Sequence, residues 1–511
     1  MNECKICVSV IANTGNEMVA LMRRAEPLAD VIELRCDRLP MEEFRDLFEN
    51  LTSEKQLLLT LRPKREGGES AADLQERIGF WMQYALHQSV DHGSVWIDHE
   101  HDLIPEKEFM FWVDKCFVIR SKHYLEGVNA DLDKAYSTVT AANEVGKLAV
   151  FVNDAVDALS IWKVLEKANA EGKRFIPIAM GEAGKWTRVL GPAYGAFMTY
   201  ASLESGSETA PGQISASDLI DTFRVREITP QHSVYGLIAA ATDYSVSPWM
   251  HNAAFKTADI PSVFVPFQTS DVEKFVRQMV LPAIREVDLN FGGFSVTNPH
   301  KGSILAFMDE LDPSAERIGA VNTVKVEEDK LKGFNTDAFG FISTLKDAYG
   351  SVEGTRVAVF GAGGAARACI VGLLDEGAQV GLFARNEEKG KTLAEEFGIA
   401  WEHIVGDRRM ADEFDIVVNA TPLGTQGGRS NFCVLTAAAL EGIKLVYDLV
   451  YNPSETRLMK EAKEAGVPTI GGMEMLIAQG AKQFEIWTGR NAPVDAMRSA
   501  VERRLIPANS E

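Results

Sequence analysis

Eight short apolar runs recur at a regular spacing over about the first 220 residues, and stretches with a helical pattern separate several of them. The helical pattern is clearest in residues 154–170, where apolar side chains recur every three or four residues on one face. Strands that alternate with helices form parallel sheets, and eight such units over this length predict a (β/α)8 barrel. Such strands are apolar throughout because both faces of the sheet are covered. The runs span residues 6–10, 31–35, 57–62, 95–98, 116–120, 147–152, 175–180 and 197–200.

The chain has 511 residues, which is too long for one ordinary domain and predicts about three. The barrel pattern ends near residues 221–233, and a second alternation of strands and helices begins near residue 337. Residues 472–504 have the pattern of two helices. We therefore expect an α/β chain of three domains. These are a barrel in residues 1–224, an α/β domain in residues 232–338 completed by helices in residues 472–505, and a further α/β domain in residues 339–471.

The composition argues against several classes of partner. The net charge is −21, whereas a nucleic-acid-binding face needs clustered cations that displace the counterions of phosphates. Small anionic substrates remain compatible with this charge, because a few focused cations can dominate the field inside a site. No apolar run approaches the ~20 residues of a membrane helix, and the first residues carry no targeting pattern. We therefore expect a cytoplasmic chain with no nucleic-acid and no membrane partner.

The cysteines and histidines give little support for a metal site. The six cysteines are scattered, as is typical of reduced thiols in a cytosolic enzyme. Cys4 and Cys7 form a CxxC pair but lack a second pair to complete a zinc site, so buried or half-buried strand cysteines are the simpler interpretation. Residues 98–102 (Asp-His-Glu-His-Asp) have no further ligand set either. We interpret them as a solvated loop and expect no metal.

A glycine-rich segment follows an apolar strand in residues 356–360 and opens a helix in residues 365–374. Glycines let the backbone approach a pyrophosphate, and the free N–H groups at the helix start can bind it. Ala366 stands at the third position of the pattern, where close helix packing tolerates Gly or Ala. The segment predicts a Rossmann dinucleotide site, with a tight structural turn as the alternative. Its candidate cofactor residues are Gly361, Ala362, Gly363, Gly364 and Ala365.

The next strand, in residues 379–384, ends in Arg385 and Asn386 and not in an acidic residue. An acidic residue there would bind the ribose 2′-hydroxyl and repel a 2′-phosphate. The planar guanidinium of an arginine can pair with that phosphate. We therefore expect the cofactor NADP(H), with an arginine on a solvated turn as the alternative.

Clusters of small hydroxyl and amide residues precede this domain, in residues 245–248, 297–301, 322–323 and 335–337. Such residues at turn signals suit the recognition of a polyol. Hydride reduction of a ketone also requires a proton donor, and a lysine oriented by an aspartate can supply the proton.

Residues of about 234–507 closely resemble the shikimate dehydrogenase family, through motifs that follow one another in order. They are Ser-x-Ser-Pro-x-x-His-Asn (245–252), Asn-Pro-His-Lys (298–301), Ala-Val-Asn-Thr (320–323), Asn-Thr-Asp (335–337), Gly-Ala-Gly-Gly-Ala (361–365), Asn-Ala-Thr-Pro (419–422), Asp-Leu-x-Tyr-x-Pro (448–453) and Gly-x-x-Met-Leu-x-x-Gln (472–479). The family often has Asn-Arg-Thr at the 2′-phosphate site, where this chain has Ala-Arg-Asn (384–386). The arginine is kept, but the sequence does not determine the other contacts to that phosphate.

The resemblance implies a role for individual residues of this region. Lys301 and Asp337 would form the catalytic pair. The substrate hydroxyls and carboxylate would be surrounded by Ser245, Ser247, Thr297, Asn322, Tyr451 and Gln479. The cofactor would be bound by the glycine-rich segment, Arg385 and Asn386, and by Thr421, Gly472 and Met475.

Charged residues mark several strand ends of the predicted barrel, where the chemistry of barrel enzymes gathers. Lys147 instead opens its apolar run. This spacing alone favours a structural lysine, because a lysine that flanks a strand is normally solvated.

Residues of about 6–223 resemble the Schiff-base class of 3-dehydroquinate dehydratase, again a (β/α)8 family, and this resemblance reverses the interpretation of Lys147. The shared features are Glu-Leu-Arg-x-Asp (33–37), Arg-x-x-x-Glu-Gly-Gly (62–68), the Asp98 strand end, Ser-x-His (121–123), the Lys147 strand, Met-Gly-x-x-Gly (180–184) leading to Arg188, and Ala-Pro-Gly-Gln (210–213). Thr209 replaces a common Ser and keeps its hydroxyl, whereas Ile178 replaces a common Met and would loosen the packing around the imine.

By this resemblance Lys147 forms an imine with the substrate ketone, which is an electron sink for the carbanion formed at the adjacent carbon. His123 would take a proton near neutral pH and then protonate the departing hydroxyl. Glu66 would orient His123, and Arg188 would bind the substrate carboxylate. The rest of the pocket would be formed by Glu33, Arg35, Arg62, Thr209 and Gln213.

Together the two resemblances imply consecutive reactions. 3-Dehydroquinate loses water to give 3-dehydroshikimate, which NADPH reduces to shikimate. One alternative is a dehydratase joined to a quinate dehydrogenase, often NAD-linked, against which Arg385 counts. The other is a catalytically silent sensor of pathway intermediates, which would be expected to lack catalytic residues and to carry a basic segment. The chain retains Lys147, His123, Lys301 and Asp337 and has no such segment.

Overall fold

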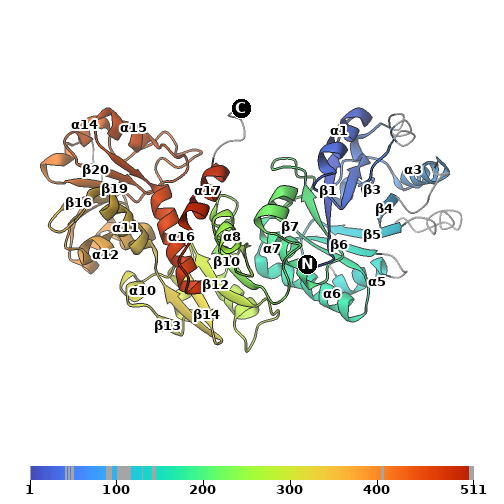
Figure 1. Cartoon of the computed structure of the whole chain (residues 1–511), viewed down its shortest axis with the longest axis horizontal. Coiled ribbons are helices and arrows are strands. Elements are labelled where there is room, and N and C mark those ends of the chain that lie inside the picture. The colour runs from blue at the N-terminus through green and yellow to red at the C-terminus, as the bar shows by residue number, and fades with distance from the viewer. Residues whose placement is uncertain are drawn as a thin grey trace. The chain divides into compact units, whose positions relative to one another are not determined.

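The computed structural model describes residues 2–40, 43, 47, 51–87, 95–100, 117–128, 131–140, 145–403 and 408–505. The chain divides into two compact units (Figure 1). The first unit comprises Met1–Tyr244 with Pro261–Phe291, and the second comprises Ser245–Ile260 with Gly292–Glu511. The three-domain bounds expected from the sequence are finer than this division and stay a prediction.

The barrel of the first unit has eight strands among its described residues, all parallel and in chain order. Each strand pairs with the next from β1 to β7, and β8 pairs with β1. The edges of β7 and β8 meet where the Phe197 N–H donates a hydrogen bond of 2.8 Å to the Phe175 carbonyl. The (β/α)8 prediction is confirmed, and β9 (Ile214–Ser215) extends the sheet beyond β8. The barrel strands are β1 (Lys5–Ile11), β2 (Val31–Arg35), β3 (Gln56–Thr60), β4 (Val95–Glu100), β5 (Phe117–Tyr124), β6 (Val145–Phe151), β7 (Phe175–Met180) and β8 (Met198–Ser202).

Helices and short turns connect these strands. The helix predicted in residues 154–170 is a 3₁₀ turn, η3 (Ala155–Ala158), that continues as α6 (Leu159–Ala170). The Asp154 carboxylate starts it by accepting a hydrogen bond of 3.1 Å from the Val156 N–H. The other helices are α1 (Gly15–Ala25), α3 (Leu74–His87), α5 (Leu132–Val139) and α7 (Lys185–Leu190), and the other turns are η1 (Cys36–Arg38), η2 (Lys64–Glu66), η4 (Glu182–Gly184), η5 (Gly191–Tyr194) and η6 (Asp218–Thr222).

Further elements of both units belong to the region after the barrel. In the first unit, β10 (Ser233–Ala239) and β11 (Ser262–Gln268) pair in parallel, and α9 (Val272–Phe275) and η7 (Val276–Val280) follow β11. In the second unit, antiparallel pairing joins β12 (Phe291–Val296) to β14 (Thr323–Glu327) and β14 to β15 (Lys330–Phe334). β13 (Glu310–Leu311) runs parallel to β15. The helices and turns of this part are α8 (Ser247–Thr257), η8 (Ser303–Phe307), α10 (Pro313–Ile318) and α11 (Asp337–Tyr349).

A six-stranded parallel sheet in the second unit has the order β18-β17-β16-β19-β20-β21. This is the doubly wound Rossmann order, and the strand order reverses between β16 and β19. Buried side chains of α12 and α13 pack on one face of the sheet, and those of α14 and α15 pack on the other. The strands are β16 (Arg356–Phe360), β17 (Gln379–Ala384), β18 (Ala400–His403), β19 (Ile416–Asn419), β20 (Leu445–Asp448) and β21 (Thr469–Gly471), and the helices and turns are α12 (Gly364–Asp375), α13 (Glu387–Phe397), η9 (Met410–Asp412), α14 (Ala437–Leu440), α15 (Arg457–Glu464), α16 (Gly472–Thr488) and α17 (Val494–Leu505).

Candidate active sites

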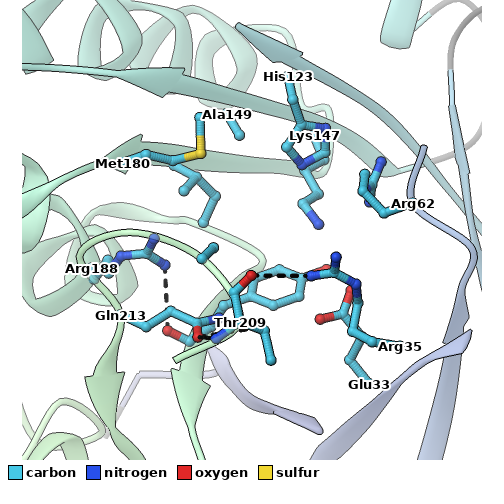
Figure 2. A pocket seen from close by; sticks show the side chains of 13 residues that line it. Glu33, Arg35, Arg62, His123, Lys147, Ala149, Met180, Arg188, Thr209 and Gln213 are labelled. Carbon is cyan, nitrogen blue, oxygen red and sulfur yellow. Dashed lines mark hydrogen bonds between the residues drawn. The ribbon is translucent and has the colours of Figure 1, made fainter. Parts of the chain in front are cut away.

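A pocket lies in the barrel and collects most of the residues predicted for the first site (Figure 2). It is lined by Glu33, Arg35, Arg62, His123, Lys147, Arg188, Thr209 and Gln213, which come from the strands and the connections that follow them. Glu66 lies behind this lining and contacts His123. The pocket therefore brings together the predicted dehydratase residues except Glu66, which contacts one of them from behind.

The Lys147 side chain points into this pocket (Figure 2). It is the third residue of β6 and only 5% exposed, and its Nζ lies 2.8 Å from Asp98 Oδ2. The interpretation from spacing alone, a solvated lysine flanking a strand, is wrong because β6 begins at Val145. Burial would raise the pKa of Asp98, but the Arg62 and Lys147 cations outweigh burial and lower it. Asp98 is therefore a carboxylate that holds the amine in place.

His123 lies beside Lys147 on the pocket wall (Figure 2). Its Nδ1 lies 2.9 Å from the Glu66 carboxylate, which favours the tautomer with the proton on Nδ1 and a free Nε2. Burial, and then the charge of Arg62, lower the pKa of His123 to about 4. The imidazole is therefore neutral near pH 7 and can act as a base.

Arg188 differs from the other two arginines of the pocket. Arg62 pairs with Asp98 at 2.7 Å and Arg35 pairs with Asp37 at 2.5 Å. Arg188 donates only to carbonyl oxygens, those of Tyr200 at 3.4 Å and Pro211 at 3.3 Å, and has no carboxylate partner among the described residues. It is 2% exposed, and burial lowers its pKa to about 10, so it stays protonated at neutral pH. This buried cation is suited to bind an anionic group.

Two glycines explain the loops that place Arg188 and Gln213. A Cβ on Gly184 would lie 2.4 Å from the Ala179 carbonyl oxygen, so the turn before α7 packs closely on β7 only with glycine. Gly212 has a φ of +72°, and a Cβ there would lie 2.2 Å from the Gly181 carbonyl oxygen. The Met-Gly-x-x-Gly and Ala-Pro-Gly-Gln motifs thus fix the backbone around the pocket.

The opposite wall of the pocket is held by hydroxyl and amide groups. Glu33 accepts hydrogen bonds from Ser9 Oγ at 2.5 Å and Thr60 Oγ1 at 2.7 Å. Gln213 Oε1 accepts from the Thr209 N–H at 2.8 Å, and Arg35 donates to the Thr209 carbonyl at 3.3 Å. These contacts fix the loop that closes the pocket.

A second cluster lies entirely within the second unit and is centred on Lys301 and Asp337. Lys301 Nζ lies 2.5 Å from Asp337 Oδ2, and Asn322 donates to Asp337 Oδ1 at 2.8 Å. Asp337 is the first residue of α11, where the helix dipole stabilises a negative charge. The predicted catalytic pair is therefore in contact.

Thr336 links this pair to two predicted substrate residues. Its N–H donates to Asn322 Oδ1 at 2.8 Å, and its hydroxyl lies 3.4 Å from Gln479 Oε1. Ser245 accepts from the Ser247 N–H at 3.2 Å at the start of α8. Thr297 directly follows β12 and Tyr451 lies after β20, and the contacts of these four residues (Ser245, Ser247, Thr297 and Tyr451) with a substrate stay a prediction.

The predicted cofactor loop joins β16 to α12 at the reversal of strand order. Gly361 has a φ of +120°, and a Cβ there would lie 2.8 Å from the Ala420 carbonyl oxygen. The first N–H groups of a helix have no partner within it, so those at the start of α12 can bind an anion at this turn. A Cβ on Gly364 would lie 4.0 Å from Lys301 Cδ, so the loop adjoins the catalytic lysine. The backbone here fits a pyrophosphate.

Other predicted cofactor residues have defined positions. Arg385 is exposed at the end of β17, and Asn386 caps α13 by accepting from the Lys389 N–H at 2.9 Å. Thr421 follows β19 and donates to Asn419 Oδ1 at 2.7 Å. Gly472 and Met475 lie in the first turns of α16, and Met475 is 8% exposed. Their contacts with the cofactor stay a prediction.

Three family models match successive parts of the chain. The model of type I 3-dehydroquinase matches residues 6–230, that of the shikimate dehydrogenase substrate binding domain matches residues 237–324, and that of the shikimate 5′-dehydrogenase C-terminal domain matches residues 472–502. The chloroplastic bifunctional 3-dehydroquinate dehydratase/shikimate dehydrogenase of Arabidopsis thaliana is 33% identical over 521 residues, which cover 96% of this chain and 83% of that protein. The chain belongs to this bifunctional family.

The dehydrogenase half has further relatives. The shikimate dehydrogenase (NADP(+)) of Methanopyrus kandleri is 39% identical over 292 residues, which cover 54% of this chain and 98% of that protein. A crystal structure of a shikimate dehydrogenase in complex with NADP+ is 37% identical with a TM-score of 0.51, and the match covers 55% of this chain and 98% of that one. Both predicted enzyme activities and the cofactor NADP(H) are confirmed.

One prediction for the dehydratase half is wrong. Asp98, His99 and Glu100 are not a solvated loop but the buried end of β4, each at most 1% exposed. The carboxylates are buried because Arg62 and Arg77 pair with Glu100 at 3.1 Å and 2.9 Å. His101 and Asp102 lie outside the described residues. Among the described residues, no three His, Cys, Asp or Glu are grouped to hold a metal.

Sequence reasoning missed several pocket residues of the dehydratase. Ala149, Met180 and Tyr200 line the pocket. Each lies on a barrel strand, and Ala149 stands two positions after Lys147, so it faces the same side of β6. The alternation of side chains along the strands could have identified Ala149 once Lys147 was placed.

Cys7 is buried in β1, whereas Cys4 is half-buried just before it, and both are free thiols. No described helix combines the length and the apolar composition of a membrane span.

Proposed function

We propose that the barrel pocket dehydrates 3-dehydroquinate through an imine on Lys147. The observation that carries this proposal is a buried amine that shares one pocket with a neutral imidazole and with a cation that has no carboxylate partner among the described residues. The Lys147 ammonium loses a proton as its nitrogen attacks the ketone carbon, and the proton is regained as water leaves, so ammonium and ketone give a protonated C=N bond and one water. The protonated imine then withdraws electrons from the adjacent carbon.

His123 would transfer the proton in the elimination. Its Nε2 takes the proton of the adjacent carbon, and the imidazolium gives the proton to the departing hydroxyl, which leaves as water. Glu66 stabilises the imidazolium through the contact of 2.9 Å to Nδ1. Hydrolysis of the product imine releases 3-dehydroshikimate and restores the amine. Arg188 would bind the substrate carboxylate, and the other lining residues would bind its hydroxyls.

In the second unit, Lys301 and Asp337 would act on the ketone of 3-dehydroshikimate. NADPH, when bound, supplies the hydride. The Lys301 ammonium, held at 2.5 Å by Asp337, donates a proton to the ketone oxygen as it becomes an alcohol. The loop at Gly361 would hold the pyrophosphate, and Arg385 would pair with the 2′-phosphate. The clustered hydroxyl and amide side chains, including Asn322 and Gln479, would bind the substrate.

The two sites would act consecutively, since the product of the first is the substrate of the second. We also propose a cytoplasmic location and no nucleic-acid partner, which the net charge of −21 and the free thiols of the described cysteines support. The test is one assay with 3-dehydroquinate and NADPH. We expect 3-dehydroshikimate to appear transiently and shikimate to accumulate with equal loss of NADPH. Accumulation of 3-dehydroshikimate without NADPH oxidation would contradict the second activity.

A further inference from the structure

One hydroxyl in the dehydratase pocket has no role in the chemistry described so far. Tyr200 is the third residue of β8, is 4% exposed and lines the pocket with Lys147 and Arg188. Its Oη has no hydrogen-bond partner among the described residues. Two other buried tyrosines do have one: the Tyr136 hydroxyl donates to Glu171 at 2.7 Å, and that of Tyr447 lies 2.6 Å from Thr344 Oγ1. A buried hydroxyl without a partner costs free energy, and such a group in a pocket indicates a hydrogen bond that forms when substrate binds.

Tyr200 also contacts two residues proposed to act on the substrate, Lys147 through its ring and Arg188 through its backbone. Lys147 Nζ lies 4.1 Å from the centroid of its ring, so the ring face is directed at the nitrogen that becomes the imine. The Tyr200 carbonyl accepts a hydrogen bond of 3.4 Å from Arg188, the cation suited to the substrate carboxylate. In 3-dehydroquinate, the carbon that carries the carboxylate also carries the departing hydroxyl, and one carbon separates it from the ketone. Because the imine carbon is bonded to Lys147 Nζ and the bonds that change begin at the next carbon, the Tyr200 ring lies beside them.

We propose that Tyr200 is a further substrate-binding residue of the dehydratase, whose hydroxyl donates a hydrogen bond to the departing hydroxyl of 3-dehydroquinate while its ring stabilises the cationic imine of Lys147. The proposal rests on the imine chemistry proposed for Lys147. Burial raises the pKa of Tyr200 well above its ordinary value, so the phenol is a neutral donor throughout the working pH range. An aromatic face attracts a cation at this distance.

The product provides the decisive comparison, because 3-dehydroshikimate has lost the hydroxyl that Tyr200 would bind. Calorimetry would measure the affinity of both compounds for Lys147→Ala and for Lys147→Ala/Tyr200→Phe, in which no turnover occurs. We expect the second change to weaken 3-dehydroquinate about tenfold and to alter 3-dehydroshikimate less than about twofold. Equal effects on both compounds, or no effect on either, would overturn the proposal.

Single variants separate this role from a structural one. Tyr200→Phe should lower kcat/KM for dehydration about tenfold, yet leave the melting temperature unchanged or higher, because it removes a hydroxyl that binds no described residue. Tyr136→Phe is the matched control: it should lower the melting temperature and leave kcat/KM within about twofold, since its hydroxyl binds Glu171 outside the pocket. If Tyr200→Phe retained full kcat/KM, the proposal would fail. Borohydride trapping in Tyr200→Phe should still fix substrate on Lys147, and loss of trapping in the wild-type enzyme would instead refute the imine itself.

Discussion

Each active site contains a lysine–aspartate pair, but the two pairs differ in burial and in their neighbours. The side chains of Lys147 and Asp98 are 6% and 0% exposed, and Asp98 also binds Arg62. The side chains of Lys301 and Asp337 are 21% and 10% exposed, and an amide, Asn322, binds the carboxylate beside the lysine. One amine lies in a buried, charged pocket suited to covalent chemistry, and the other lies partly exposed beside the predicted cofactor loop, where we propose that it transfers a proton. Burial and partners, more than residue type, determine what each lysine does.

Replacing the two lysines should separate the two activities. Lys147→Ala should lower kcat for dehydration at least about 1,000-fold, because no imine can form, and leave the NADP-linked reaction within about twofold. Lys301→Ala should do the reverse, lowering reduction about 100- to 10,000-fold because the proton donor is lost. Steady-state assays of each half-reaction measure both effects. If either variant impaired both reactions equally, the two lysines would not serve separate sites.

Two arginines of the barrel pocket, Arg188 and Arg62, should differ in what they contribute to substrate binding and to stability. Arg188→Met should raise KM for 3-dehydroquinate about 10- to 100-fold and cost little stability, because its guanidinium has no carboxylate partner among the described residues. Arg62→Met should instead lower the free energy of unfolding by about 3–5 kcal/mol, because it leaves Asp98 and Glu100 buried with a partner missing. Urea unfolding and initial rates measure the two quantities. Similar loss of stability in both variants would contradict the distinction.

At the predicted 2′-phosphate site we expect a smaller effect of substitution, because Arg385 is exposed. Arg385→Ala should raise KM for NADPH about tenfold and change KM for NADH little, since only NADPH carries the 2′-phosphate. Lys389→Ala, an exposed cation in the first turn of α13, is the matched control and should alter neither constant appreciably. A rise in KM for both cofactors with Arg385→Ala would indicate a role other than phosphate recognition.

The effect of pH on His123 tests the electrostatics of the dehydratase pocket. In the folded protein its pKa is lowered to about 4, mainly by burial, from an ordinary value of 6.5. The unfolded chain therefore binds a proton at this residue between pH 6.5 and 4 that the folded protein does not bind. His123 thus lowers stability as the pH falls through this window, and the cost is constant below about pH 4. NMR titration should find its imidazole neutral at pH 5.5, and a pKa near 6.5 would contradict the burial argument.

Much of the fold could be predicted from local patterns, and the misses have physical causes. The eight apolar runs and the strand–glycine–helix order of β16 and α12 are local features, so the barrel and the Rossmann sheet could be identified. The spacing places Lys147 at the start of its strand because Gly146 separates Val145 from the apolar run that follows the lysine. Yet Gly146 belongs to β6, where a Cβ would lie 2.6 Å from Thr140 Cγ2. Small size, and not polarity, is what that position requires.

The interior of the sites depends on contacts between distant segments. Residues 98–100 contain three ionisable side chains and suggest solvent exposure, but Arg62 and Arg77 neutralise their carboxylates from other parts of the chain. No local pattern in the sequence predicts these ion pairs. The contact of Lys301 with Asp337 likewise spans 36 residues, and only the family resemblance indicated it.

The most direct test of the central claim is to identify the covalent intermediate of the dehydratase. The wild-type enzyme would be treated with 3-dehydroquinate and borohydride, digested, and its peptides weighed and sequenced by mass spectrometry. We expect a reduced adduct on Lys147, with dehydration abolished and shikimate oxidation retained. An adduct on another lysine, or full dehydratase activity after treatment, would contradict it.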